Sequence, residues 1–461
     1  MVARILILVF LVLTSVKTLP SQEVLHFEMV ADFPPGIVYG EFAPGEPDRI
    51  YLTCLGGRVL IFDISTGQFV PEPFFQIDLS ISGEGGLFSL VFHPDYQTNG
   101  RLFVCFTDSD NGNNVVVDEY RRTGPNRAER ADQPVIVIER PPTTTPGHNG
   151  GWMDFGKDGY LYISVGEMNP VFENSQLIDD NLKGAILRID VNGDDFPVSD
   201  KRNYAIPPDN PLVGLPGDDE ILAYGIRNAW RCSFDSDGNL FVADLQGSLR
   251  EEINVIPAGH QQALNFGWPF FEGTLECPLP FLCDDFTGQQ VTSPIFEYEH
   301  SFGNSGSGGV IGGYVYQGSN RRLQGQYFYA DFRDGFRIRS FTFDGTMDPN
   351  DFNGNNVINP RSWQTSRPIP DNAPFVAPFV VSFFEDLDKN LYLVDSHGRV
   401  FRMDSIRPVG DFNGDNTVDL LDIGQFIEAL NSDDYLGLGD INNDLRVDVN
   451  DIAPFVNLIQ N

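Results

Sequence analysis

The chain has few positive charges, and this scarcity excludes whole classes of partner. Its 461 residues include 30 Lys and Arg against 65 Asp and Glu, which gives a formal net charge of −35. Such a charge disfavours nucleic acid and anionic membrane surfaces, so neither is an expected partner. The excess of carboxylates fits an extracellular protein, or one that binds divalent cations.

Long apolar runs are absent beyond the N-terminus. Residues 1–20 combine Arg4, a short apolar run over 5–12 and small polar residues, which is the pattern of a secretory signal peptide. The run is shorter than the about 20 residues of a membrane span, and an uncleaved anchor is the alternative. We therefore expect a secreted, cell-surface or periplasmic protein that is not integral to a membrane.

Cysteine is also scarce, and the five copies form no Cys/His spacing typical of zinc. Cys277 and Cys283 bracket a loop-like stretch, so we predict a disulfide between them in an oxidising compartment. Cys54 and Cys105 lie in apolar, strand-like runs and are predicted to be buried thiols.

Long helical periodicity is missing from residues 24–405, where one local pattern recurs instead. A turn pair precedes an aliphatic and aromatic strand six times, at 48–52, 99–104, 158–163, 237–242, 325–330 and 389–394. Six copies, spaced by roughly 50 to 90 residues, indicate a radial β architecture. We predict a mainly β fold with a six-bladed β-propeller over 24–405; two β-sandwiches are the alternative. The stretches 191–219 and 269–310 are expected to be long insertions.

One pair of residues suggests catalysis. His148 lies in a turn of small residues, and Glu167 follows 19 positions later at the end of a strand-like run. A turn and such a strand can bring both groups to one rim of a sheet, where the carboxylate fixes the histidine tautomer and supports its charged form. We predict a general base; the alternative is a surface turn and a solvent-exposed strand end. A second site-like segment, 225–228, lies downstream.

Residues 409–461 differ in composition from the rest of the chain and contain a duplication. The stretch 410–461 holds eleven acidic residues and one basic residue, Arg446. Two twelve-residue loops, 411–422 and 440–451, lie 29 residues apart, and each precedes a helical run, 423–430 or 452–459. Oxygen ligands at loop positions 1, 3, 5, 9 and 12, with a backbone carbonyl at 7, are typical of an EF-hand-type calcium site. The predicted ligands are Asp411, Asn413, Asp415, Thr417, Asp419, Asp422, Asp440, Asn442, Asp444, Arg446, Asp448 and Asp451.

A disordered acidic tail is the alternative for this segment. Position 6 of such a loop favours Gly, and Asn416 and Leu445 stand there, so the second loop is expected to bind more weakly. With Asp at the end of each loop, the pair resembles a dockerin, a small α-helical module. The resemblance implies a calcium-folded domain that docks on a cohesin-like receptor through its helix faces.

The body of the chain resembles the glucose/sorbosone dehydrogenase family. The resemblance is carried, in order, by Gly85-Gly86-Leu87, Phe92-His93-Pro94-Asp95-Tyr96, His148-Asn149-Gly150-Gly151, Ala185-Ile186-Leu187-Arg188-Ile189-Asp190, Tyr204-Ala205-Ile206-Pro207-Pro208-Asp209-Asn210-Pro211, Gly225-Ile226-Arg227-Asn228, Glu252-Ile253-Asn254 and Asn265-Phe266-Gly267-Trp268-Pro269. The family includes quinoprotein glucose dehydrogenases, aldose sugar dehydrogenases and hedgehog-interacting-protein-like proteins. The resemblance implies a propeller that binds pyrroloquinoline quinone (PQQ) through calcium and oxidises a sugar.

The resemblance also implies roles for single residues. His148 would be the base that takes the proton of the sugar C1 hydroxyl, Glu167 the acid that orients it, and Arg227 the group that stabilises negative charge on the quinone oxygen. The implied cofactor contacts are Glu84, Asn228, Arg333 and, as calcium ligands through their carbonyls, Gly247 and Ser248.

The chain departs from the catalytic members where they place two arginines on the cofactor carboxylates. The matching stretch, 379–384, contains no cation, and two missing cations should weaken binding of a tricarboxylate. This stretch is closer to the hedgehog-interacting-protein-like branch. We therefore keep three hypotheses: a PQQ-dependent sugar dehydrogenase, a non-catalytic propeller that binds carbohydrate or protein, and a glycoside hydrolase, for which no carboxylate pair can be named.

Overall fold

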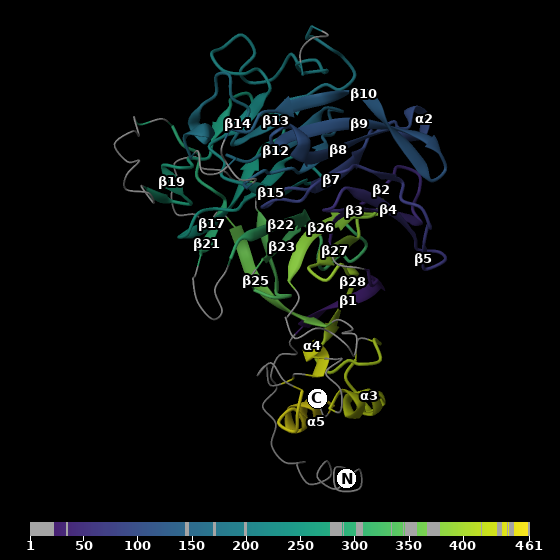
Figure 1. The fold of residues 1–461 in the computed structure, drawn as a ribbon. Helices are drawn as coiled ribbons and strands as arrows, with labels where there is room; N and C mark the ends of the chain where they lie inside the picture. The colour runs from purple at the N-terminus through teal and green to yellow at the C-terminus, as the bar shows by residue number, and fades with distance from the viewer. Residues whose placement is uncertain are drawn as a thin grey trace.

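Most of the chain folds as a ring of β-sheets, and a small helical segment follows it (Figure 1). The computed structural model describes residues 23–33, 36–142, 147–168, 172–197, 201–276, 288, 290–300, 308–332, 334–343, 345, 357–366, 379–415, 417–430, 436–439, 441 and 447–459. The sheets form a six-bladed β-propeller, so this part of the prediction is confirmed.

Each blade is a mainly antiparallel sheet whose strands follow one another in order from the centre of the ring to its edge. Blade 1 contains β2 (Ile37–Phe42), β3 (Arg49–Cys54), β4 (Arg58–Asp63), β5 (Gln68–Phe69) and β6 (Phe75–Gln76), and blade 2 contains β7 (Leu87–Phe92), β8 (Arg101–Asp108), β9 (Asn114–Gly124) and β10 (Arg127–Ile138). Blade 3 contains β11 (Met153–Phe155), β12 (Leu161–Val165), β13 (Ala185–Ile189), β14 (Ile221–Tyr224) and β18 (Leu264–Asn265), the last of which pairs in parallel. Blade 4 contains β15 (Ala229–Phe234), β16 (Leu240–Asp244), β17 (Arg250–Ile256) and β21 (Phe296–Glu299), and a hairpin of β19 (Phe271–Glu272) and β20 (Leu275–Glu276) lies beside it. Blade 5 contains β22 (Val310–Val315), β23 (Gln326–Asp331), β24 (Ile338–Phe343) and β25 (Val357–Ser366), and blade 6 contains β26 (Val380–Glu385), β27 (Leu391–Asp395), β28 (Val400–Pro408) and β1 (Glu23–Ala31).

The six repeats predicted from sequence are the second strands of the six blades, which are β3, β8, β12, β16, β23 and β27. Such a strand is covered on both faces by neighbouring blades, and this explains its unbroken apolar character. All five residues of β12, for example, are buried. The turn before the strand needs a left-handed residue, which is Gly159 in blade 3 (φ 82°) and Lys389 in blade 6 (φ 64°).

A single arginine joins four blades at the centre. Arg231, on β15, is buried, and burial lowers its pKa to about 10. Its guanidinium donates to the carbonyl oxygens of Val38 (2.9 Å) and Phe88 (3.1 Å) and to the hydroxyl of Ser382 (2.9 Å). These acceptors lie in the innermost strands β2, β7 and β26 of blades 1, 2 and 6, so the side chain fixes the ring across its axis.

The ring closes through its first strand. β1 pairs antiparallel with β28 and so completes blade 6. On its other edge β1 pairs in parallel with β25 of blade 5. Residues from opposite ends of the propeller sequence therefore share one sheet.

The C-terminal segment packs its helices through equivalent residues of the two repeats. Helices α3 (Ile423–Ala429) and α5 (Ile452–Ile459) coincide with the predicted helical runs, and a short α4 (Leu436–Gly439) lies between them in sequence. The rings of Phe426 and Phe455, 29 positions apart, meet at 4.0 Å between centroids. Among the described residues, 3-10 turns span Ser109–Asn111, Phe172–Gln176 and Leu420–Asp422, and the short helix α2 spans Tyr96–Asn99.

The cysteine predictions have two outcomes. Cys54 and Cys105 are buried free thiols, as predicted, and so is Cys232. Cys277 and Cys283 lie outside the described residues, so their disulfide remains a prediction. In the described part of the chain, no helix is long and apolar enough to cross a membrane.

Candidate active site

The predicted pair lies where two loops meet at the rim of blade 3. His148 precedes the innermost strand, β11, and Glu167 follows β12, which pairs antiparallel with β11. Antiparallel neighbours place the start of one strand beside the end of the next, so both residues come to one rim. We call this rim the site face. It also carries the loop 225–228 before β15 and the loop 245–249 after β16.

His148 and Glu167 are hydrogen-bonded and shielded from solvent. Nδ1 of His148 lies 2.7 Å from Oε1 of Glu167, whose side chain is fully buried. The other carboxylate oxygen accepts the indole N–H of Trp268. Because an ionised carboxylate only accepts hydrogen bonds, Nδ1 must donate, and Nε2 of neutral His148 is left as the proton acceptor. The arrangement is that of an oriented general base.

The backbone of His148 is held in a left-handed conformation, with φ at 48°. Its amide N–H donates to Oε2 of Glu84 (2.9 Å), and its carbonyl oxygen accepts from the amide of Met168 (3.1 Å). A Cβ at Gly166 would lie 2.1 Å from that carbonyl oxygen, so only Gly fits there. The close approach of the two loops explains why the sequence is small and glycine-rich on either side of the pair.

Arg227 and Asn228 are anchored by one buried carboxylate. Their amide N–H groups donate to Asp244 at 2.9 Å and 2.7 Å. Burial raises the pKa of Asp244 to about 7, and these two amide bonds oppose the shift. Asn228 in turn accepts the amide N–H of Gly150 (2.9 Å), which joins this segment to the loop of His148.

One donor of Arg227 has no hydrogen-bond partner among the described residues. One terminal nitrogen donates to the carbonyl of Leu245 (2.9 Å), and the guanidinium lies 5.5 Å from the ring centroid of Trp268. Its Nε is buried and has no hydrogen-bond partner among the described residues. A buried donor of this kind is costly unless something fills its position.

The loop of Gly247 and Ser248 is shaped by Glu272. The amide N–H groups of Ser248, Leu249 and Arg250 all donate to Oε1 of Glu272, at 2.5, 2.6 and 3.1 Å. A trans peptide is planar, with its C=O opposite its N–H, so the carbonyls of Gly247 and Ser248 both point away from Glu272. Two carbonyl oxygens that point the same way are ligands of the kind calcium takes.

Of the other predicted cofactor contacts, one lies on the site face and one lies outside the described residues. Glu84 is exposed on the site face, beside His148. Arg333 lies outside the described residues. Strand β26 covers most of the stretch 379–384, where the resemblance led us to expect an arginine pair, and it carries no cation. Of the predicted cofactor contacts, Glu84, Arg227, Asn228 and the loop of Gly247 and Ser248 thus share the site face with His148.

The C-terminal loops repeat their hydrogen bonds. The two oxygens of Asp422 accept from the amides of Phe412 (2.8 Å) and Asp419 (2.9 Å), and those of Asp451 accept from Ile441 (2.8 Å) and Asp448 (2.9 Å). Four predicted ligands lie outside the described residues: Asp440, Asn442, Asp444 and Arg446. Within the described ranges, no group of three or more His, Cys, Asp or Glu side chains could hold a metal ion. Calcium binding by these loops stays a prediction.

Sequence reasoning missed several residues of the site face. It used Trp268 only as part of a motif, and it did not single out Asp244 or Glu272. A second buried pair, Nδ1 of His300 with Oε1 of Glu251 at 2.5 Å, also went unnoticed. Bonding to Glu251 raises the pKa of His300. These contacts join residues up to 101 positions apart, as for Glu167 and Trp268, and no local spacing signals them.

The fold and the site together define a class of protein: a β-propeller that carries an oriented histidine on one loop face. This scaffold suits enzymes and binding modules alike. The model of the family described as Glucose / Sorbosone dehydrogenase matches residues 41–348, and the chain belongs to this family.

Its curated relatives cover both branches. The chain is 29% identical over 437 residues to the HIPL2 protein of Arabidopsis thaliana. The alignment covers 80% of this chain and 60% of the HIPL2 protein. It is 29% identical over 228 residues to aldose sugar dehydrogenase YliI of Escherichia coli. This alignment covers 48% of this chain and 57% of YliI. The chain thus spans about 60% of the length of the HIPL proteins that it matches.

Solved structures support the fold. The PQQ-bound aldose sugar dehydrogenase of Streptomyces coelicolor matches 84% of this chain and 99% of its own, with a TM-score of 0.58 and 20% identity. The apo form of the soluble aldose sugar dehydrogenase of Escherichia coli matches 83% and 99%, with a TM-score of 0.62 and 20% identity.

Proposed function

We propose that the chain is a secreted, PQQ- and calcium-dependent dehydrogenase that oxidises an aldose at C1. The observation that carries this proposal is the buried His148–Glu167 pair with its free Nε2 on the site face. The family, and relatives named as aldose sugar dehydrogenases, support the same assignment. We further propose that residues 409–461 bind calcium and dock the protein on a cohesin-like receptor.

His148 would take the proton of the C1 hydroxyl at Nε2, and Glu167 would stabilise the imidazolium that forms. PQQ, when bound, supplies the acceptor for the two electrons. The side chains of Arg227 and Asn228 would hold the quinone portion, and the carbonyls of Gly247 and Ser248 would hold its calcium.

A second function has a specific observation in its favour. The absence of cations in β26 leaves the carboxylates of PQQ without the arginine pair of catalytic members. Hedgehog-interacting protein of Homo sapiens is a relative as well, 27% identical over 62% of this chain. A non-catalytic propeller that binds carbohydrate or protein on the same face is therefore the alternative.

One titration separates the two functions. Apo-protein is titrated with PQQ in excess calcium, and dye reduction is then followed with a panel of aldoses. Saturable activity that disappears in His148→Ala and persists in His260→Ala, a histidine that follows β17 at the opposite end of the blades, would establish the dehydrogenase. Folded protein that binds no PQQ under these conditions would refute it and favour the binding module.

A further inference from the structure

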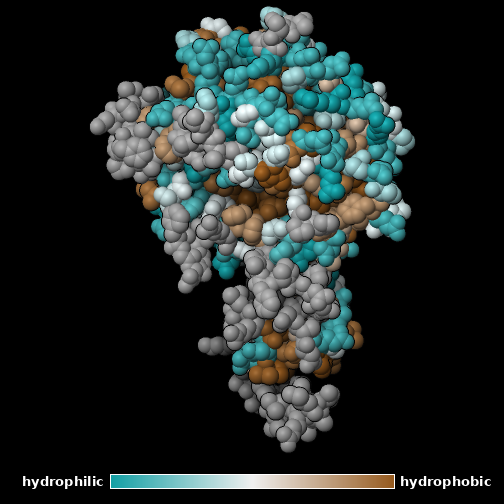
Figure 2. Space-filling model, viewed as in Figure 1, coloured by the Kyte–Doolittle hydropathy of each residue, from teal (hydrophilic) through white to brown (hydrophobic). Residues whose placement is uncertain are grey.

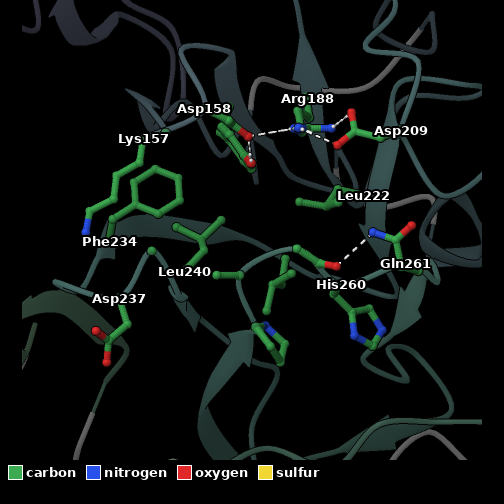
Figure 3. Close-up of a pocket in the computed structure, with 17 residues that line it drawn as sticks. Lys157, Asp158, Arg188, Asp209, Leu222, Phe234, Asp237, Leu240, His260 and Gln261 are labelled. Carbon is green, nitrogen blue, oxygen red and sulfur yellow. Dashed lines mark hydrogen bonds and ion pairs between the residues drawn. The ribbon is translucent and has the colours of Figure 1, made fainter.

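A cavity of about 210 Å³ opens on the face of the propeller opposite the candidate active site (Figure 3). It lies between the β11–β12 turn of blade 3 and the β15–β16 turn of blade 4, and the residues after β17 close its third side. Strand β12 runs from this cavity to Glu167. Five residues of strand span about 17 Å, so the cavity is distinct from the site face.

The floor of the cavity is apolar and aromatic. Leu222, Leu240 and Phe234 contribute to it. The ring of Phe234 is only partly buried, and it packs edge-on against Tyr162 with 5.0 Å between the centroids. An aromatic ring fixed by a second ring is a rigid surface for the apolar face of a ligand.

One wall consists of carboxylates held by an arginine. Arg188 donates to Oδ2 of Asp158 (2.9 and 3.0 Å), to Asp209 (2.8 and 3.2 Å) and to the side chain of Asn210 (2.8 Å). Figure 3 shows Arg188 between the two acids along one side of the cavity. The guanidinium donors face these oxygens, so the wall presents fixed acceptors rather than a free cation.

The opposite side of the cavity carries a histidine and two charged side chains. Nε2 of His260 is buried and has no hydrogen-bond partner among the described residues. Asp237 lines the cavity from the β15–β16 turn and is exposed. Lys157 is the second cation at the rim, and it donates to the carbonyl of Ser236.

We propose that this cavity binds one ring of a neutral carbohydrate. Three carboxylates, Asp158, Asp209 and Asp237, face two cations, Arg188 and Lys157, so an anionic ligand is disfavoured. Hydroxyl groups both donate and accept, and they match a wall rich in acceptors above an apolar floor. The volume is below the about 300–1,000 Å³ of pockets for drug-sized ligands, which limits the occupant to a single ring.

Such a site would hold the protein on a glycan while the site face stays open. Glycan binding in this cavity requires neither PQQ nor dehydrogenase activity, so its failure and the failure of the proposed function can be told apart.

Full-length protein is titrated with methyl glycosides of glucose, galactose, mannose and xylose, and saturation-transfer NMR follows binding. These glycosides lack a free C1 hydroxyl, so oxidation at C1 cannot consume them. We expect saturable binding of at least one of them, which His260→Ala and Asp237→Asn each weaken about tenfold. His148→Ala should leave this binding unchanged.

The matched control is Asp388→Asn. Asp388 occupies the same position in the corresponding turn of blade 6: its amide donates to Asp386 at 2.9 Å, as that of Asp237 does to Asp235 at 2.8 Å. Equal weakening by the control, binding that disappears in His148→Ala, or no saturable binding at all would overturn the proposal. Saturable binding of spermidine that displaces the bound glycoside would also overturn it, because the site would then select cations.

Discussion

Replacing Glu167 by Gln tests the candidate base through hydrogen-bond direction alone. Gln has nearly the same shape as Glu, but one of its two terminal atoms donates. The indole of Trp268 can only donate, so the Gln oxygen must face Trp268 and the amide nitrogen must face Nδ1 of His148. Nδ1 then has to accept, the proton moves to Nε2, and the base is lost.

The size of the effect follows from the alternative orientation. Turning the Gln oxygen back to His148 restores the useful tautomer but leaves two buried N–H groups facing each other, one from Gln and one from Trp268. At about 1–3 kcal/mol for each unsatisfied donor, the cost is about 4 kcal/mol. This corresponds to a loss of about 10³ in kcat, with KM little changed.

The double variant Glu167→Gln/Trp268→Phe supplies the critical measurement. Removing the indole N–H frees Gln to turn its oxygen to His148, so activity should rise at least tenfold above that of Glu167→Gln. Trp268→Phe alone should cost about tenfold. Nitrogen NMR of labelled His148 in the protein without PQQ should report the tautomer directly, with the proton on Nε2 in Glu167→Gln and on Nδ1 in the double variant.

Two results would contradict the proposed effect of Glu167 on the tautomer of His148. One is a Glu167→Gln variant within tenfold of the parent in kcat. The other is a tautomer of His148 that does not respond to Trp268→Phe. Either would mean that Glu167 does not set the proton position on His148.

Three further predictions address the scaffold. Arg231→Met should lower the free energy of unfolding by about 3 kcal/mol in urea, because it strands buried carbonyl acceptors. Arg127→Met, which removes an exposed arginine paired with an exposed glutamate, should change it by less than about 0.5 kcal/mol, and equal effects would contradict the central role of Arg231. Burial raises the pKa of Glu41 from its ordinary value of 4.5 to about 8, so between these pH values the folded chain keeps a proton that the unfolded chain releases. The melting temperature should therefore fall as the pH rises from 4.5 to 8. Glu41→Gln should reduce this dependence of the melting temperature on pH, and an unchanged dependence would refute the assignment. Calcium should raise the melting temperature of the protein. Titration calorimetry should show one calcium site fewer in Asp422→Ala, while Glu428→Ala, at an exposed helix position, should keep the parent stoichiometry. If the parent protein takes up no calcium, the predicted calcium loops are excluded.

Local sequence was enough to predict the propeller. Its second strands are buried on both faces, so each appears as a continuous apolar run after a turn that needs a left-handed residue such as Gly159 or Lys389. Chain closure was not visible, because the pairing of β1 with β28 depends on contacts across nearly the whole propeller sequence. Arg231 gave no signal either, since its partners are mostly backbone carbonyls.

The candidate site divides in the same way. Spacing along one hairpin brought His148 and Glu167 together, because antiparallel pairing converts a short separation in sequence into one rim. Trp268 and Glu272 reach the site from a long insertion, and their positions depend on tertiary packing that no periodicity encodes. The shape of the 247–250 loop is set by Glu272, so the direction of its carbonyls could not be foreseen from the loop alone.

The parallel and antiparallel partners of β1 tie completion of the ring to the end of synthesis. At about 5–20 residues per second, the ribosome needs about 20–70 s to pass from Val24 to Val380, where blade 6 begins. During that time Val24, Leu25 and Phe27, all fully buried in the finished protein, lack their antiparallel partner strand β28. The nascent chain thus carries an unpaired apolar strand for most of its translation, and such a strand is a template for pairing with another chain.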